Sequence, residues 1–190
     1  MLSEPRPIPW SQIRHWSCVA CGECCKWFSI PLTAYEYAKI CQRYGFNITE
    51  LWEGRAWLKK RMDKRCVFMI WRNERWLCGL QESKPHACRM WPFKVFDRPT
   101  YGKEMRARYE SEEWTEYVYA DPRCPRLIYG VPTQNFERTI VREFVQMALR
   151  KREHQDFSTA SLQVTSVAMC QSHVNLLLNP DACRIIRAGY

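Results

Sequence analysis

Four cysteines fall within eight residues near the start of the chain, and no other feature constrains its fold so strongly. The segment reads Cys18-Val19-Ala20-Cys21-Gly22-Glu23-Cys24-Cys25. The spacing of the first three, C-x2-C-x2-C, allows one loop to direct three thiolates at a single metal centre. Gly22 suits such a loop, because a chain that curls around a metal needs a residue that adopts positive φ easily. We therefore expect this segment to be a metal-binding loop.

Cys25 is expected to play a different part from its neighbours. As the residue directly after Cys24, it tends to point away from the centre that Cys24 faces. It is thus a poor fourth ligand for that centre. It is a better first ligand for a second centre, or a thiol beside the first.

The cysteine count bears on the redox state of the chain. The 190 residues include eleven cysteines, an odd number that a complete set of intrachain disulfides cannot use. Prolines and charges occupy residues 1–10 where the apolar part of a signal peptide would lie. No uninterrupted apolar run is long enough to span a bilayer. We expect a cytoplasmic protein with reduced thiols and no membrane insertion.

The formal net charge is +9. Each oxidised iron–sulfur site held by four thiolates would add roughly two negative charges, so two sites would leave the chain mildly basic. A solvated surface is favoured over nucleic-acid binding as the reason for this charge.

Hydrophobic and turn patterns predict short elements of both kinds. Three prolines in 1–17 predict an extended arm, from which Trp10 and Trp16 pack back onto the domain. A strand is expected at 26–30, and a capping box predicts a helix from Thr33 to about Tyr44. Three further expectations are a helical stretch over 47–63, a hairpin formed by 66–71 and 76–78, and a proline-punctuated loop at 84–93.

The later part of the chain is predicted to be more helical. A hairpin is expected between 101–109 and 114–120, followed by an amphipathic helix over 134–152. Residues 157–180 contain no Asp, Glu, Lys or Arg and suit a helix that covers the core or docks on a partner. The fold class expected is a small α+β, cysteine-rich metal-binding domain with short β-hairpins and surrounding helices. Its predicted divisions are an extended N-terminal arm at 1–15, the cysteine-rich domain at 16–130 and a helical C-terminal extension at 131–190.

Eight cysteines and two short segments together resemble the YkgJ family, a zinc- or iron-chelating domain with a CxxCxxCC signature. The segments are Ile30-Pro31-Leu32-Thr33 and Lys84-Pro85-His86-Ala87-Cys88-Arg89-Met90-Trp91-Pro92-Phe93. Lys84 stands where the family tends to have arginine. The resemblance covers about 16–130 and implies a metal or cofactor site formed by Cys18, Cys21, Cys24, Cys25, Cys66, Cys78, Cys88 and Cys124.

Iron–sulfur chemistry is the favoured interpretation of these thiols. Eight divide into two sets of four, one with Cys18, Cys21 and Cys24 and the other with Cys25, and the distant ligands are left unassigned. A tandem triplet followed by single cysteines suits one or two [4Fe-4S] clusters, whereas structural zinc sites usually have two separated C-x2-C pairs. Zinc is the alternative. Packing or hydrogen bonding is favoured over ligation for Cys41, His86, Cys170, His173 and Cys183.

Two classes of function remain open at this stage. The first is a cytoplasmic iron–sulfur protein that acts in electron transfer or as an accessory subunit of a larger assembly, with a protein partner. The second is a structural zinc module that presents a basic, aromatic surface, from 47–65 and 138–152, to RNA or to a protein. No nucleophile–base pair or paired carboxylates stand out, so whether the chain is an enzyme is left open.

Overall fold

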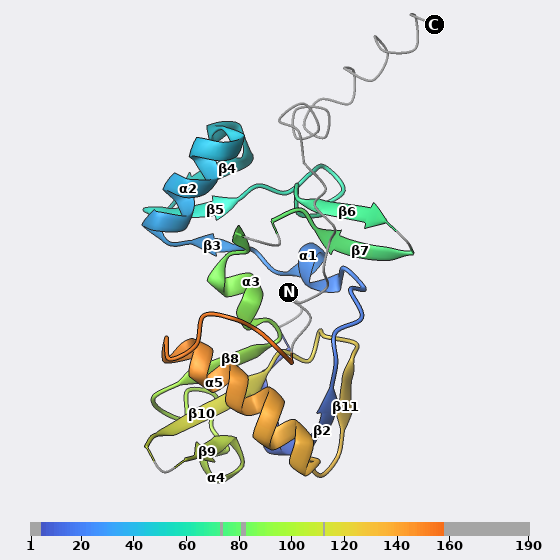
Figure 1. Ribbon diagram of the computed structural model, residues 1–190, viewed down its shortest axis with the longest axis vertical. Coiled ribbons are helices and arrows are strands. Elements are labelled where there is room, and N and C mark those ends of the chain that lie inside the picture. The colour runs from blue at the N-terminus through green and yellow to red at the C-terminus, as the bar shows by residue number, and fades with distance from the viewer. Residues whose placement is uncertain (1–4, 73, 81–82, 112, 158–190) are drawn as a thin grey trace, which may run out of the picture. The chain divides into compact units, whose positions relative to one another are not determined.

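The computed structural model describes residues 5–72, 74–80, 83–111 and 113–157. Within these ranges the chain forms several small antiparallel sheets and a few helices, so the predicted α+β class is confirmed (Figure 1). None of the helices in these ranges has the length and apolar character that crossing a membrane requires. The predicted elements of 158–190 and the thiols of Cys170 and Cys183 lie outside the described residues.

The chain divides into two compact units. Of the described residues, the first unit contains 5–24 and 88–157, and the second contains 25–87. The chain passes between the units inside two short helices, α1 (Glu23–Trp27) and α3 (His86–Met90).

The first unit is built on a four-stranded antiparallel sheet. Its order is β1-β10-β8, and β9 also pairs with β10. A separate two-stranded sheet joins β2 to β11. The strands are β1 (Ile8–Pro9), β2 (Ile13–Trp16), β8 (Phe93–Phe96), β9 (Arg108–Glu110), β10 (Thr115–Ala120) and β11 (Leu127–Tyr129), with the short helices η1 (Trp10–Gln12) and α4 (Glu104–Ala107) between them.

One helix closes the core of this unit. It begins with a π-helical turn, η4 (Phe136–Val141), and continues as α5 (Arg142–Ala148), so the predicted amphipathic helix is confirmed over a shorter range. It packs against β2 and β8, as Figure 1 shows for α5 and β8. Its buried stripe meets Trp10 and Trp16, which pack into the core as predicted, and consists of Phe136, Ile140, Val141, Phe144 and Val145.

The second unit contains the helix that the capping box predicted. Helix α2 (Ala34–Tyr44) starts after Thr33, whose hydroxyl accepts from the N–H of Glu36. The Glu36 carboxylate in turn accepts from the N–H of Thr33. The helix ends at Gly45, which has φ of 86°. The local signals were sufficient here, because both ends are fixed by neighbouring residues.

The helical stretch predicted for 47–63 is wrong. A short η2 (Phe46–Ile48) leads into a hairpin of β4 (Thr49–Trp52) and β5 (Arg55–Leu58), and β3 (Pro31–Leu32) pairs with the other edge of β5. Glu53 and Gly54 both have positive φ, at 49° and 72°. Two such residues form the tight turn that matches the twist of a hairpin, and that turn overrides the helical pattern.

The hairpin predicted from 66–78 is confirmed as β6 (Met69–Arg72) and β7 (Arg75–Cys78). Three other predictions are wrong in whole or in part. Residues 23–27 form α1 where a strand was expected from residue 26, and the strand follows at β3. Part of the expected loop 84–93 is the helix α3, and residues 104–107 of the expected strand 101–109 are the helix α4.

Glu143 fastens the end of the first unit. Its side chain is fully buried on α5 and accepts hydrogen bonds from the backbone N–H of Asp156, at 2.7 Å, and of Phe157, at 3.0 Å. The guanidinium of Arg152 lies 3.9 Å away. We predict that Glu143→Ala lowers the free energy of unfolding by about 2–4 kcal/mol, because it leaves buried donors unsatisfied.

Urea denaturation measures this change. Glu137→Ala, at an exposed position one turn and a half earlier, is the matched control and should shift the free energy of unfolding by less than about 0.5 kcal/mol. Equal effects of the two substitutions would contradict the role assigned to Glu143.

Candidate metal centre

The cysteine run folds as a tight loop followed by a helical turn. Ala20 and Gly22, on either side of Cys21, both have positive φ, at 55° and 78°. The positive φ expected of Gly22 is confirmed, and the one at Ala20 was not foreseen. The loop curls around Cys21, and the N–H of Glu23 at the start of α1 hydrogen-bonds back to the Cys21 sulfur.

Cys24 and Cys25 both lie on α1. Successive residues of an α-helix are about 100° apart around its axis, so the two side chains leave in different directions. The division of the chain into units also falls between them, with Cys24 in the first unit and Cys25 in the second.

Cys124 joins the run from far along the sequence. It is buried in the core of the first unit, and its sulfur accepts a hydrogen bond from the Trp16 indole N–H at 3.3 Å. Trp16 is itself fixed by edge-to-face contacts with Phe93 and Phe144. A hydrogen bond from the Arg126 backbone also reaches the Cys124 sulfur.

A turn built on Asp121 sets the position of Cys124. The N–H of Cys124 donates to the Asp121 carbonyl at 3.1 Å. The buried Asp121 carboxylate accepts from the backbone N–H of Arg123 at 3.0 Å and binds its guanidinium through both oxygens, at 2.9 and 2.6 Å. Because an Asp carboxylate that binds its own backbone two residues on stabilises a turn, the loop that presents Cys124 is preorganised.

The thiols of the first unit affect one another electrostatically. Burial raises the pKa of Cys124, the hydrogen bonds from Arg126 and Trp16 lower it, and the charges of Cys21 and Cys18 raise it again. Burial likewise raises the pKa of Cys21. There the Glu23 backbone lowers it, and the nearby charges of Cys24, Cys18 and Glu23 raise it.

These effects identify a thiol set in the first unit: Cys18, Cys21, Cys24 and Cys124. Cys18 packs against the same core that holds Cys124. The sulfurs of Cys21 and Cys124 each accept a hydrogen bond from the backbone of the residue two positions later in the chain. Hydrogen bonds to sulfur favour the thiolate, which is the form that binds a metal.

Three more of the predicted ligands lie in the second unit and are linked through the backbone. The N–H of Cys66 donates to the Cys25 carbonyl at 2.9 Å, and the N–H of Met69 donates to the Cys66 carbonyl at 3.0 Å. Met69 is the strand partner of Cys78. We refer to Cys25, Cys66 and Cys78, whose backbones are connected in this way, as the second thiol set.

The remaining candidates have diverse surroundings. Cys88 is on α3 in the first unit, and the guanidinium of Arg89 beside it donates to the Glu153 carbonyl at 2.8 Å. The backbone N–H of His86 donates to Glu36 at 2.6 Å. Cys41 is buried, with its sulfur 3.6 Å from the Thr49 hydroxyl, as expected for a core cysteine.

The donor chemistry of the first set suits a thiophilic metal. Among the described residues, no group of three or more His, Cys, Asp or Glu side chains is already arranged to hold a metal ion. The nine cysteines of these ranges are thiols. Thiols whose pKa is raised by burial and by neighbouring thiol charges lose their protons readily when a cation is placed among them, so the residues present fit zinc or an iron–sulfur cluster.

The supporting residues were harder to find from the sequence than the cysteines. The sequence predicts only that Trp16 packs onto the domain, and it does not single out Asp121 or Arg123. The Asp-Pro pair before Arg123-Cys124 was the available signal for a fixed turn. No sequence signal pairs Trp16 with a thiol 108 positions away.

Comparison with protein families decides the assignment. The family model described as "CxxCxxCC: Putative zinc- or iron-chelating domain" matches residues 17–125, more than half of the chain. The chain belongs to this family. Searches of curated proteins and of solved structures found no match. The CxxCxxCC match spans the whole of the first thiol set, from Cys18 to Cys124, and all of the second unit's Cys25, Cys66 and Cys78.

The ion pair of Asp121 and Arg123 should make the free energy of unfolding depend on pH. Burial alone would raise the pKa of Asp121, but the hydrogen bonds and charge of Arg123, with the charge of Lys94, lower it below its ordinary value. A lowered pKa in the folded state stabilises the fold above the pKa of the unfolded state, and this contribution is lost as pH falls through the folded pKa.

We therefore predict that Asp121→Asn lowers the free energy of unfolding by about 1–3 kcal/mol near neutral pH. The difference from wild type should shrink below about pH 4. Urea denaturation between neutral and acid pH measures it, with Asp97→Asn as the exposed control. A difference that stays constant down to about pH 2 would contradict the assignment.

Proposed function

We propose that this chain is an iron–sulfur protein, whose first centre is held by Cys18, Cys21, Cys24 and Cys124. The observation that carries the proposal is that all four lie in one compact unit, where the charges of Cys21 and Cys18 reach the buried Cys124. The sequence leaves the distant member of this set open, and we propose Cys124 for it because it lies in the same unit as the other three.

The choice of iron–sulfur over zinc rests on the pattern of the ligands. Three cysteines in tandem followed by a distant one, itself followed by Pro125, is typical of the bacterial ferredoxin ligand run. Zinc sites more often combine two separated pairs. The family description allows both metals.

The surroundings of Cys124 support a redox role. A bound cluster would supply one-electron chemistry, and the residues of the chain would set its potential. The Trp16 indole N–H and the two backbone N–H groups stabilise negative charge on the sulfurs, which favours the reduced state. The aromatic core around Trp16 keeps water from one side of the thiol set. We propose electron transfer, or an accessory role in a larger assembly, as the function of this centre.

Cys25, Cys66 and Cys78 are proposed to hold a second centre in the second unit. Their backbones are joined by the contacts through Cys66 and Met69. This arrangement explains why the family signature ends in two adjacent cysteines, since Cys24 and Cys25 would then serve different centres.

Cysteine variants test the first centre. We predict that Cys124→Ser, in protein purified without oxygen, loses at least about half of the iron and acid-labile sulfide bound by wild type, because one thiolate of the set is replaced by a weak ligand. Cys41→Ser is the control and should leave both contents unchanged, since Cys41 is a core residue bonded to Thr49.

Either of two results would contradict the ligand set. One is unchanged iron and sulfide in Cys124→Ser, and the other is loss of both in a Cys41→Ser protein that remains folded. Zinc without iron or sulfide in wild type would replace the iron–sulfur proposal with a structural zinc module.

The indole hydrogen bond makes a separate prediction. Trp16→Phe preserves an aromatic ring in the core and removes the donor to Cys124. We predict that the reduction potential of the centre becomes more negative, because the reduced cluster loses a hydrogen bond, while iron content is retained. Redox titration of the visible spectrum measures the shift, and Trp114→Phe, on a partly buried tryptophan of the same unit, is the control. An unchanged potential would sink the assigned role of Trp16.

A further inference from the structure

An aromatic pair stands on the hairpin that carries Cys78. Trp71 and Trp76 are strand partners on β6 and β7, and their ring centroids are 4.7 Å apart. Trp71 is 56% exposed. The guanidinium of Arg65 lies over the ring of Trp76, 4.6 Å from its centroid. The two rings are tilted by 57° to each other, and we call the cluster of Trp71, Trp76 and Arg65 the tryptophan platform.

Positive charge is concentrated around this platform. Residues 59–78 contain seven lysines and arginines against two acids, so +5 of the formal charge of +9 lies in these twenty residues. Asp63 neutralises part of it through ion pairs with Arg61 and Arg65. Glu74 is the other acid. Within the described residues, Arg72 and Arg75 are exposed, face each other across the end of the hairpin and take part in no ion pair.

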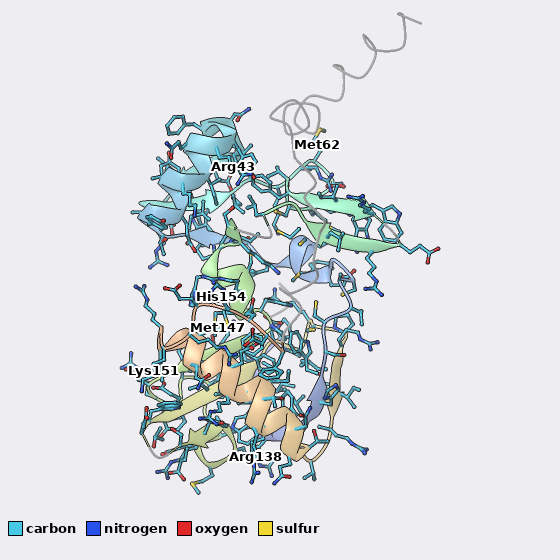
Figure 2. All side chains as sticks on the ribbon, viewed as in Figure 1. Arg43, Met62, Arg138, Met147, Lys151 and His154 are labelled. Carbon is cyan, nitrogen blue, oxygen red and sulfur yellow. The ribbon has the colours of Figure 1, made fainter. Side chains whose placement is uncertain are left out.

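Two basic residues that follow α5 in the first unit, Lys151 and Arg152, do form ion pairs. Lys151 is paired with Glu113 at 2.7 Å and lies over the Trp114 ring at 4.2 Å. Arg152 contacts Glu143 and Asp156. Figure 2 shows Lys151 near one end of the C-terminal helix and Arg138 at the other. In 138–152, one of the two basic, aromatic regions anticipated from the sequence, two of the five basic residues are thus held in ion pairs.

We propose that the tryptophan platform binds single-stranded nucleic acid, with a base stacked on the exposed ring of Trp71 and with Arg72, Arg75 and Lys64 near the phosphates. The inference concerns a surface beyond the thiol sets. It extends the proposed function to a second ligand.

The chemistry of the surface fits this ligand better than an acidic protein. The exposed indole of Trp71 offers a flat face on which any base can stack, and the tilted ring of Trp76 supports it from the neighbouring strand. Unpaired arginines at the hairpin end attract a regularly spaced anion. A protein partner would need aliphatic contacts there, and the exposed residues that the structure describes at this end of the hairpin are Trp71, Arg72, Glu74 and Arg75.

The hairpin is also tied to the second thiol set. Cys78 ends β7 on the same face of the hairpin as Trp76, because alternate residues of a strand share a face. Its strand partner Met69 follows the turn from Cys66. A metal held by these thiols would fix the base of the hairpin that presents the platform.

Fluorescence anisotropy tests the proposal. The full chain, purified without oxygen, is titrated into a fluorescein-labelled oligouridylate of about twelve nucleotides at several salt concentrations. We expect binding that weakens as salt rises, and Trp71→Ala should reduce affinity by about 5- to 150-fold. Trp71→Phe, which retains an aromatic face, should recover part of the loss.

Matched variants separate stacking from general attraction. Trp52→Ala, at a 63% exposed tryptophan on β4 of the same unit, should leave affinity unchanged. Arg75→Gln should lower the dependence of log affinity on log salt by about 0.7, the value for one phosphate contact. Arg55→Gln, on β5, should not change it. Circular dichroism and iron content confirm that each variant is folded.

Four outcomes would overturn the proposal. They are no binding at low salt, equal losses in the Trp71→Ala and Trp52→Ala variants, tighter binding to a duplex of the same length, and binding of polyglutamate with equal affinity that is insensitive to Trp71→Ala. The last result would indicate an acidic protein as the partner.

Discussion

The cost of ionising two buried thiols among neighbouring thiols is the constraint on which the first unit depends. Burial raises the pKa of Cys21 and of Cys124, and the charges of Cys24 and Cys18 add to it at Cys21, as those of Cys21 and Cys18 do at Cys124. Hydrogen bonds stabilise this arrangement, because the Trp16 indole and the backbones of Glu23 and Arg126 donate to the sulfurs. The turn built on Asp121 also holds Cys124 in place. A bound metal would convert the repulsion into attraction, so metal binding and the stability of this unit should be coupled.

The elements that could be predicted from the sequence are those fixed by near neighbours. Helix α2 has both its caps in the residues that directly flank it, and the β6–β7 hairpin has a polar turn between two apolar arms. The prediction of a helix over 47–63 was wrong because a two-residue turn at Glu53 and Gly54 outweighs the helical pattern of the segment. The helix at 23–27 was not predicted, because its two cysteines were assigned to a metal-binding loop.

The candidate site divides along the same line. Local geometry is enough to predict three features: the metal-binding loop of the cysteine run, the positive φ of Gly22, and the different directions of the Cys24 and Cys25 side chains. The partnership of Cys124 with the run cannot be predicted in this way, because it depends on β2, β11 and the core that brings Trp16 to Cys124 across the sequence. The tryptophan platform likewise depends on strand register, which places Trp71 opposite Trp76. Long-range pairing of this kind leaves no trace in spacing alone.

The central claim is that the thiol sets hold iron and sulfide. Native mass spectrometry of the full chain, purified and sprayed without oxygen, tests it most directly, since the mass added to the polypeptide identifies what is bound. The account predicts an increment of iron and sulfide in equal numbers, matching one or two four-iron clusters. An increment of one or two zinc ions without sulfide would contradict it and identify a structural zinc protein.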